Sequence, residues 1–428
     1  MFKKLIGAIC ISSCLFYGLK AEATDVRVAL VQGQKNVALK AEHAFKVLDL
    51  GTGTEQNFPK GKYFARIQDG HIYLEKTELG QAIQFISVDD KELPSINGRN
   101  YDGLLKIQID GENLLATNTL ELEKLLCRVL PSKTMPIWPD EAIKAQAVAA
   151  RSYILHQKAQ MAGKKYDLKA LDEETPYIGL GQRVEKSAIS KLIKETEGQF
   201  VADYYGRPIY ALTTSSSGGK TESAKEALGV DYSYLKSVKD FDEDSPEHKW
   251  DFRISPDYVT ELLAQHGFIV GKLANVRLSP ANEPGGDRTE SGRVKYLILG
   301  GSLGTAKLSG QHFAELFNLN SNNFDVQTGT PVPEKIEIPI ENIYGMEIGR
   351  KQIPIKVKEK EPKIWNEYMR SYHVLTGGKD EKLIFRGKGK GKGIGLSAWG
   401  ARAMASGEEP KSYKEILMHY YPGTHLVK

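Results

Sequence analysis

Glycine occupies every second position in one stretch of the chain, RGKGKGKGIG from Arg386 to Gly395. Side chains of an extended chain alternate between two faces, so Lys388, Lys390 and Lys392 would share one face and the glycines the other. Glycine lets a second backbone or a ligand come close. A flexible linker has a similar composition. Because a helix pattern follows directly, the stretch favours a structural role, and its lysine row favours an anionic partner.

The first 23 residues follow the plan of an export signal. Two lysines precede a mostly apolar run from Leu5 to Leu19, and Ala21-Glu22-Ala23 resembles a cleavage site. The run has about 15 residues, fewer than the ~20 of a membrane-spanning helix, so we expect cleavage and export to the periplasm or cell envelope. Ile11–Cys14 also resembles a lipoprotein cleavage box, which leaves a lipid anchor on Cys14 open.

The composition excludes several classes of protein. Hydrophobic residues make up 41% and charged residues 26% of the 428 positions, as in soluble globular proteins. A net charge of +4 argues against a nucleic-acid binder driven by overall charge. None of the nine histidines pairs with Cys or another His at metal-ligand spacing, so we expect no metal. The stretch around Gly219-Lys220-Thr221 lacks the first glycine of a phosphate-binding loop, and no cofactor is indicated.

The order of secondary-structure signals predicts an α+β fold. Short strand patterns with tight turns fill residues 24–98, and a second set of strands follows from Tyr101 to Thr117. A helix is expected from Pro139 to Gln160, with a single apolar stripe. We therefore expect a signal peptide (1–23), a small β-rich module (24–98) and an α+β domain (99–428).

Two helices are expected at the C-terminal end. The first covers Ser397–Ser406 and would be closed by Gly407 in a left-handed conformation. The second starts at a capping box formed by Ser412 and Glu415 and stops before Pro422-Gly423.

Three ordered blocks resemble the SpoIID/LytB family, the stage II sporulation protein D and amidase-enhancer domains. They are Asn118–Tyr153 (with AQAVAARSY), Tyr210–Lys236 (with SSSGGKTES) and Gly389–Thr424 (with HYYPGT), and the resemblance spans residues 99–428. It implies an open groove that binds the glycan strands of peptidoglycan. Sporulation-type members are lytic transglycosylases, in which one glutamate protonates the glycosidic oxygen and then helps to close a 1,6-anhydro ring. Other members enhance an amidase.

The chain departs from the family at the position of that glutamate. The family pattern resembles V-V-P-S-E-M-P-x-x-W-P, and Lys133 stands at the glutamate position in this chain. A protonated lysine is a poor acid and would repel an oxocarbenium-like transition state. Lys390 and Lys392 likewise replace a tryptophan and a histidine of the family's glycine-rich block.

The candidate site residues come partly from composition and partly from the resemblance. Lys133 holds the family's catalytic position, and Glu222 is a substitute acid, with Glu123, Asp140 and Glu141 as further options. The substrate-binding candidates are Arg151, Ser216, Ser217, Gly218, Gly219, Thr221, Lys236, Lys390, Lys392, Ser397, Tyr420 and Tyr421. Trp138 and Trp399 are candidates to stack on sugars, although core packing explains aromatic residues equally well.

Two hypotheses remain open. The protein is either a non-catalytic glycan binder or amidase activator, with a basic groove for muramic-acid carboxylates, or a lytic transglycosylase that uses another carboxylate. The expected partners are peptidoglycan glycan strands and a cell-wall amidase, with no nucleic acid. Membrane attachment would come only from the export signal or a lipidated Cys14.

Overall fold

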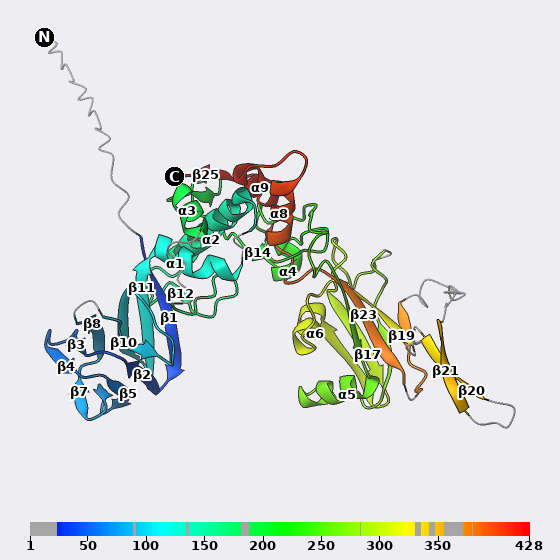
Figure 1. Cartoon of the computed structure of the whole chain (residues 1–428), viewed down its shortest axis with the longest axis horizontal. Coiled ribbons are helices and arrows are strands. Elements are labelled where there is room, and N and C mark those ends of the chain that lie inside the picture. The colour runs from blue at the N-terminus through cyan, green and yellow to red at the C-terminus, as the bar shows by residue number, and fades with distance from the viewer. Residues whose placement is uncertain are drawn as a thin grey trace, which may run out of the picture. The chain divides into compact units, whose positions relative to one another are not determined.

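The computed structural model describes residues 24–88, 91–133, 137–180, 188–282, 284–329, 335–341, 347–354, 371–378 and 380–428. It divides into two compact units, one formed by residues up to Leu125 together with Gly163–Lys169, the other by Leu126–Ala162 and Ala170–Lys428 (Figure 1). The proposed export signal and Cys14 lie outside the described residues. No helix in the described ranges is both long and apolar enough to span a membrane.

The first unit consists of two antiparallel-rich sheets. In the described residues the larger sheet has the order β12-β1-β11-β10-β8-β3-β4 and the smaller one β7-β6-β5-β2-β9. The strands are β1 (Asp25–Gln34), β2 (Asn36–Ala41), β3 (Phe45–Asp49), β4 (Glu55–Phe58), β5 (Gly61–Gln68), β6 (His71–Leu74), β7 (Thr77–Leu79), β8 (Ala82–Ser87), β9 (Ser95–Ile96), β10 (Leu104–Asp110), β11 (Asn113–Glu121) and β12 (Leu168–Lys169). The strands expected between Tyr101 and Thr117 therefore belong to the same sheet as β1.

Tight turns set the register of this unit. Asp69 and Gly70, both with positive φ, join β5 to β6, and Gly111 (φ 64°) joins β10 to β11, so both predicted turns are confirmed. Alternate strand residues face the interior, where Phe45 packs against Phe58 and Tyr63 at ring-centroid distances of 5.4 and 5.5 Å. Apolar side chains thus fill the space between the two sheets.

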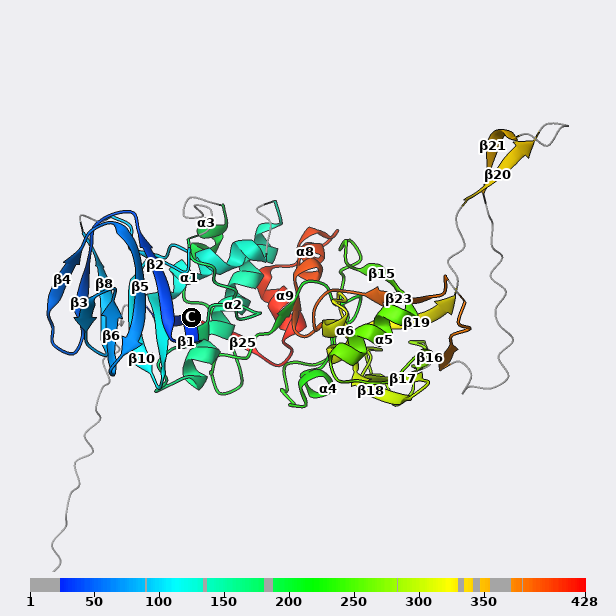
Figure 2. The same cartoon turned by 90° about the horizontal axis from the view of Figure 1, so that it is seen from below.

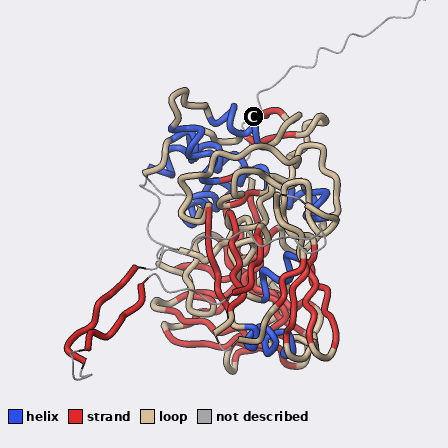
Figure 3. Tube along the Cα trace, turned by 90° about the vertical axis from the view of Figure 1, so that its right-hand side faces the viewer, coloured by secondary structure: helices blue, strands red, loops and turns tan. Residues whose placement is uncertain are grey.

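The second unit is built around helix α2 (Asp140–Gln160), which confirms the expected helix with Pro139 as its N-cap. The expectation of a single apolar stripe is wrong, because every residue from Ala142 to Ile154 except Lys144 is buried. Small alanine side chains let neighbouring helices approach from several sides. These neighbours are α3 (Ala188–Glu195), α8 (Ala398–Ser406) and α9 (Tyr413–Tyr420) (Figure 2). Figure 3 shows several helices close to the C-terminus of the chain.

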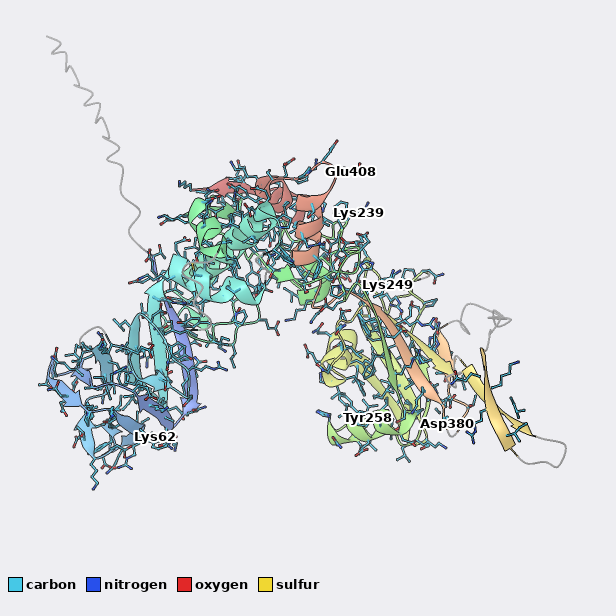
Figure 4. All side chains as sticks on the ribbon, viewed as in Figure 1. Lys62, Lys239, Lys249, Tyr258, Asp380 and Glu408 are labelled. Carbon is cyan, nitrogen blue, oxygen red and sulfur yellow. The ribbon has the colours of Figure 1, made fainter. Side chains whose placement is uncertain are left out.

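A lobe of two further sheets completes the second unit. One sheet has the order β15-β23-β19 and the other β18-β17-β16-β22, with helices α5 and α6 alongside and a continuous apolar core. The elements are β15 (Lys249–Ile254), α5 (Pro256–Gln265), β16 (Leu273–Arg277), β17 (Tyr296–Gly301), β18 (Gly304–Ser309), α6 (Gly310–Leu316), β19 (Phe324–Gly329), β22 (Tyr372–Val374) and β23 (Lys382–Lys388). Lys249 pairs with Lys388 at one end of the first sheet, and Asp380 precedes β23 at the opposite end (Figure 4).

The remaining elements are short. They are α1 (Leu122–Val129), the 3₁₀ turn Leu130–Ser132, β13 (Phe200–Ala202), β14 (Thr213–Thr214), α4 (Ala224–Leu228), β20 (Lys335–Glu341), β21 (Glu347–Pro354), β24 (Leu396–Ser397) and β25 (His425–Val427). Strand β25 pairs with β13, and β24 runs parallel to β14.

The two C-terminal helices differ in how well they were predicted. The capping box of Ser412 and Glu415 is confirmed at the start of α9. The left-handed cap expected at Gly407 is wrong, because this residue is extended (φ −65°, ψ 179°). The chain instead returns through a hydrogen bond from the Lys411 amide to the Met404 carbonyl at 2.9 Å.

Candidate functional site

A cavity of about 880 Å³ lies within the second unit. Its walls come from the turn after α1, the start of α2, the segment at residues 173–174, β14, α6 and the turn at residues 389–395 before α8, called the glycine-rich turn. The charged, threonine and tryptophan side chains of the lining are Lys133, Trp138, Glu173, Glu174, Thr213, Thr214, Glu247, Glu315, Lys390, Lys392 and Trp399. The cavity thus joins segments from across more than 250 residues of sequence.

Two tryptophans form one wall of the cavity. Trp138 and Trp399 meet edge to face, with ring centroids 5.3 Å apart. Trp138 is buried, whereas Trp399 is half-buried and carries the guanidinium of Arg402 5.2 Å from its ring centroid. Trp138 therefore supports Trp399, and Trp399 is the ring with surface left for a ligand.

Lys133, which the sequence resemblance places at the family's glutamate position, is held in a polar cluster. Its ammonium donates hydrogen bonds to Thr213 Oγ1 at 2.8 Å and to Glu174 Oε2 at 3.3 Å. The same Glu174 oxygen accepts from the Thr213 amide at 3.0 Å and hydroxyl at 2.6 Å. The lysine and glutamate side chains are 23% and 16% exposed, so the ion pair is partly shielded from water.

A local turn places the two glutamates beside Lys133 and the glycine-rich turn. Asp172 Oδ1 accepts hydrogen bonds from the amides of Glu174 (2.9 Å) and Thr175 (3.1 Å), as in an Asx turn. Asp172 Oδ2 accepts from the buried hydroxyl of Tyr153 on α2 at 2.8 Å. Burial, followed by the charge of Asp172, raises the pKa of Tyr153, so this hydroxyl keeps its proton and anchors the turn to the helix.

The two lysines of the glycine-rich turn are both paired with acids. Lys390 Nζ lies 3.1 Å from Glu247 Oε1, and Lys392 Nζ lies 2.7 Å from Glu173 Oε2. Burial would lower the pKa of Lys392, but the hydrogen bond and charge of Glu173 outweigh it, so the pKa is raised. The basic groove that the sequence suggested is therefore a cavity of ion pairs.

The glycine-rich turn is not a regular strand. Gly389, Gly391, Gly393 and Gly395 all have positive φ, between 71° and 95°. This conformation breaks the strict alternation expected of an extended chain, so Lys388 does not share the cavity with Lys390 and Lys392. A Cβ at Gly393 would lie 2.1 Å from a guanidinium nitrogen of Arg293, so glycine is needed for space as well.

The serine-rich loop (residues 215–221) lies behind this turn, and only its first residue, Ser215, lines the cavity. Ser216 and Ser217 are fully buried and donate to Asp242 and Asp240, the second over 2.6 Å. Gly218 donates its amide to Asp242 at 2.8 Å, and the Thr221 hydroxyl accepts from the Val238 amide at 2.8 Å. Ser216, Ser217, Gly218, Gly219 and Thr221 are all absent from the cavity lining. Their contacts fasten the loop to the segment at residues 238–242.

Glu222 is buried beside the unpredicted residue Arg293. Its carboxylate accepts from the Ser291 hydroxyl at 2.6 Å and does not line the cavity. Arg293 donates to the carbonyls of Ser217 (2.9 Å) and Gly391 (3.2 Å). Burial lowers the pKa of Arg293 to about 10, against the opposing charge of Glu222. Arg293 thus holds the serine-rich loop against the glycine-rich turn.

The remaining candidates are spread through the unit. Arg151 is buried and donates to the Gln199 carbonyl at 2.8 Å, and Ser397 caps α8 through the Gly400 amide. Tyr420 and Tyr421 are core residues whose hydroxyls donate to Asp240 (2.6 Å) and the Leu212 carbonyl (2.8 Å). None of these four lines the cavity, and neither does the exposed Lys236. Of the further acids, Asp140 and Glu141 are also outside the lining, and Glu123 belongs to the first unit.

Sequence reasoning missed the three glutamates that pair with the cavity lysines, Glu173, Glu174 and Glu247. The Asp172-Glu173-Glu174-Thr175 stretch offers one signal, because an Asp side chain often accepts a hydrogen bond from a backbone amide about two residues further on, in an Asx turn. Nothing local in the sequence indicates which lysine each glutamate would meet.

Comparison with known proteins identifies the class. Residues 110–203 match the family model described as Stage II sporulation protein, SpoIID. An uncharacterized protein of Brachyspira hyodysenteriae is 23% identical over 363 residues, which cover 84% of this chain and 81% of that protein. The Amidase enhancer of Bacillus subtilis is 26% identical over 389 residues, 86% of this chain but only 50% of the enhancer's length. Stage II sporulation protein D of the same species is 27% identical over 148 residues, 31% of this chain and 43% of that protein. Residues 110–203 therefore carry the SpoIID family match, and the chain is similar to SpoIID-type proteins over most of its length.

Proposed function

We propose that this protein is an exported cell-wall remodelling protein that binds the glycan strands of peptidoglycan, with a role in cell division or envelope or spore morphogenesis. The observation that carries this proposal is the cavity at the family's catalytic position, lined by Trp399 and by side-chain ion pairs. Half-buried aromatic rings and polar groups are the usual means of holding a sugar. An open cavity leaves room for a polymer to pass through as a groove.

Binding without cleavage fits the chemistry around Lys133. A general acid for glycosidic cleavage must hold its proton near neutral pH. The neighbouring carboxylate of Glu174 already accepts hydrogen bonds at Oε2 from Lys133 and twice from Thr213, so this oxygen is engaged within the protein. Lys133 itself is a cation where the transition state gains positive charge. The family's reaction therefore lacks its proton donor at this position.

The second candidate, a lytic transglycosylase with a relocated carboxylate, rests on the place of Glu174. This residue contacts the side chain at the family's catalytic position and lines the cavity, which Glu222 does not. The hydrogen bonds from Lys133 and Thr213 to its side chain all reach Oε2, so Oε1 would be the oxygen that meets a substrate.

One experiment separates the two candidates. Purified residues 24–428 are incubated with glycan strands stripped of stem peptides, and the products are analysed by mass spectrometry for 1,6-anhydro ends. Retention on intact sacculi without such ends supports the binder. Cleavage that disappears in Glu174→Gln but persists in Glu222→Gln supports the enzyme instead. A Lys133→Glu variant that gains cleavage would show that the cavity still accepts the strand in a productive position.

An amidase partner and an extracytoplasmic location belong to the same proposal. Their support is the similarity to a protein named Amidase enhancer, together with the signal-like N-terminal sequence. A pull-down of the partner from cell-wall extracts, and cell fractionation with an antibody against the chain, would test them.

A further inference from the structure

Among the charged side chains that line the cavity, acids outnumber lysines by one. Its lining holds three lysines and four glutamates, and each lysine forms an ion pair with a glutamate of the same lining. The fourth acid, Glu315 on α6, is exposed and accepts a hydrogen bond from Gln311 at 2.8 Å. A ligand that enters therefore meets no lysine of this lining without a counter-charge already in place.

The pairs of the glycine-rich turn differ in how firmly their acids are held. Glu247 is 26% exposed, and the Ser245 hydroxyl lies 3.3 Å from its Oε2 while Lys390 contacts Oε1. Glu173 is 77% exposed and contacts Lys392 at 2.7 Å. The raised pKa of Lys392 agrees with a negative surrounding field, to which Glu174 and Glu315 also contribute.

This arrangement matters because the muramic acid of a glycan strand exists in two charge forms. Where a stem peptide is attached, the lactyl carboxyl is part of an amide and is neutral at that point. Where an amidase has removed the peptide, the carboxyl is free and negative. A free carboxylate that approaches Lys390 or Lys392 meets Glu247 or Glu173 already paired there, and it enters a cavity whose lining has one more acid than lysines.

We propose that Glu173 and Glu247 are specificity-determining residues that make the cavity prefer strands whose lactyl carboxyls are still in amide linkage over stripped strands. This inference rests on the proposed glycan binding and names the form of the strand. It reverses the expectation from the lysines alone, which favoured free carboxylates. The preferred form is the one on which an amidase has yet to act.

The test compares two synthetic glycans of equal length, one with free lactyl carboxylates and one with the same carboxyls capped as N-methylamides. Binding to wild-type residues 24–428 and to Glu173→Gln, Glu247→Gln and the double variant is measured by isothermal titration calorimetry. The wild type should bind the capped glycan more tightly. Each substitution should raise affinity for the carboxylate form up to about fivefold, the range of a partly exposed ion pair. Affinity for the capped form should stay unchanged.

Glu55→Gln serves as the control, since Glu55 pairs with Lys46 over 3.0 Å in the first unit and its 47% exposure lies between those of Glu247 and Glu173. It should change neither affinity. Equal changes for both glycans, or no gain for the carboxylate form, would overturn the inference while leaving glycan binding intact. If the wild type binds neither glycan, the proposed function fails together with it. A thermal melt of each variant confirms that folding is retained.

Discussion

Lys133 and Glu174 form an ion pair at 3.3 Å, and Thr213 donates two hydrogen bonds to the same carboxylate oxygen. The cation that the sequence resemblance aligns with the family's glutamate is therefore matched by a carboxylate 41 positions further along the chain. The positive charge at residue 133 thus has both a counter-charge, Glu174, and a hydrogen-bond acceptor, Thr213, in the folded protein.

Removing the ammonium tests how much this pair stabilises the fold. We expect Lys133→Met to lower the free energy of unfolding by about 1–3 kcal/mol, because Glu174 loses a charged partner in a partly buried place. Urea denaturation measures the change. Lys411→Met is the control, since Lys411 pairs with the 90%-exposed Glu409 and should contribute less than about 1 kcal/mol. Equal losses in the two variants would mean that the Lys133 pair has no special weight.

Trp399 should provide most of the aromatic contact with a bound sugar. Trp399→Ala is expected to weaken binding to peptidoglycan glycan by about two- to tenfold, since a lost aromatic contact costs about 0.5–1.5 kcal/mol. Sedimentation with intact sacculi measures the fraction bound. Tyr204→Ala, which removes an 85%-exposed ring outside the cavity, should leave binding unchanged. If the Trp399→Ala protein sediments like wild type, Trp399 does not contact the bound sugar and that part of the proposal is wrong.

Gly393 combines a left-handed backbone with a lack of space. Gly393→Ala should destabilise the protein by more than the ~1–2 kcal/mol that a left-handed conformation alone costs, because its Cβ would meet Arg293. Gly423→Ala isolates the backbone cost, since Gly423 has φ 78° and no atom within 4 Å of the added Cβ. Chemical denaturation compares the two, and a Gly393→Ala loss no larger than that of Gly423→Ala would contradict the packing argument.

His373 on β22 should make stability depend on pH. Burial lowers the pKa of His373 below its usual value, although the hydrogen bond with the Leu278 carbonyl opposes this shift. The unfolded chain then binds a proton more readily than the folded one, so stability is present above about pH 6.5 and is lost as pH falls through the lower folded pKa. In His373→Gln the decline in unfolding free energy below pH 6.5 should be shallower. An unchanged slope in pH-dependent melts would exclude His373 as its source.

Local sequence patterns were enough to predict much of the secondary structure. Helix α2, the capping box at Ser412 and the turns at Asp69-Gly70 and Asp110-Gly111 depend on neighbouring residues, and all were predicted. Gly407 was not, because glycine permits a left-handed cap without requiring one. The end of α8 depends instead on how the chain returns to Met404 through Lys411.

The candidate site was only partly accessible to such reasoning. The resemblance drew attention to Lys133, Lys390 and Lys392, and all three line the cavity. It could not indicate that each meets a glutamate, because Glu173 and Lys392 are 219 positions apart and ion pairing at that range depends on the whole fold. The burial of Glu222 near the charge of Arg293 likewise could not be predicted, because it depends on how the lobe folds against the serine-rich loop.

Arg293 has a consequence for how this domain can be divided. It lies in the lobe between β16 and β17, yet it donates to backbone carbonyls of the serine-rich loop and of the glycine-rich turn. Excision of residues 249–388 would leave those two carbonyls without their donor, so we expect the remaining domain not to fold without the lobe. The second unit should melt in a single calorimetric transition, and minimal versions of the domain will have to keep the lobe.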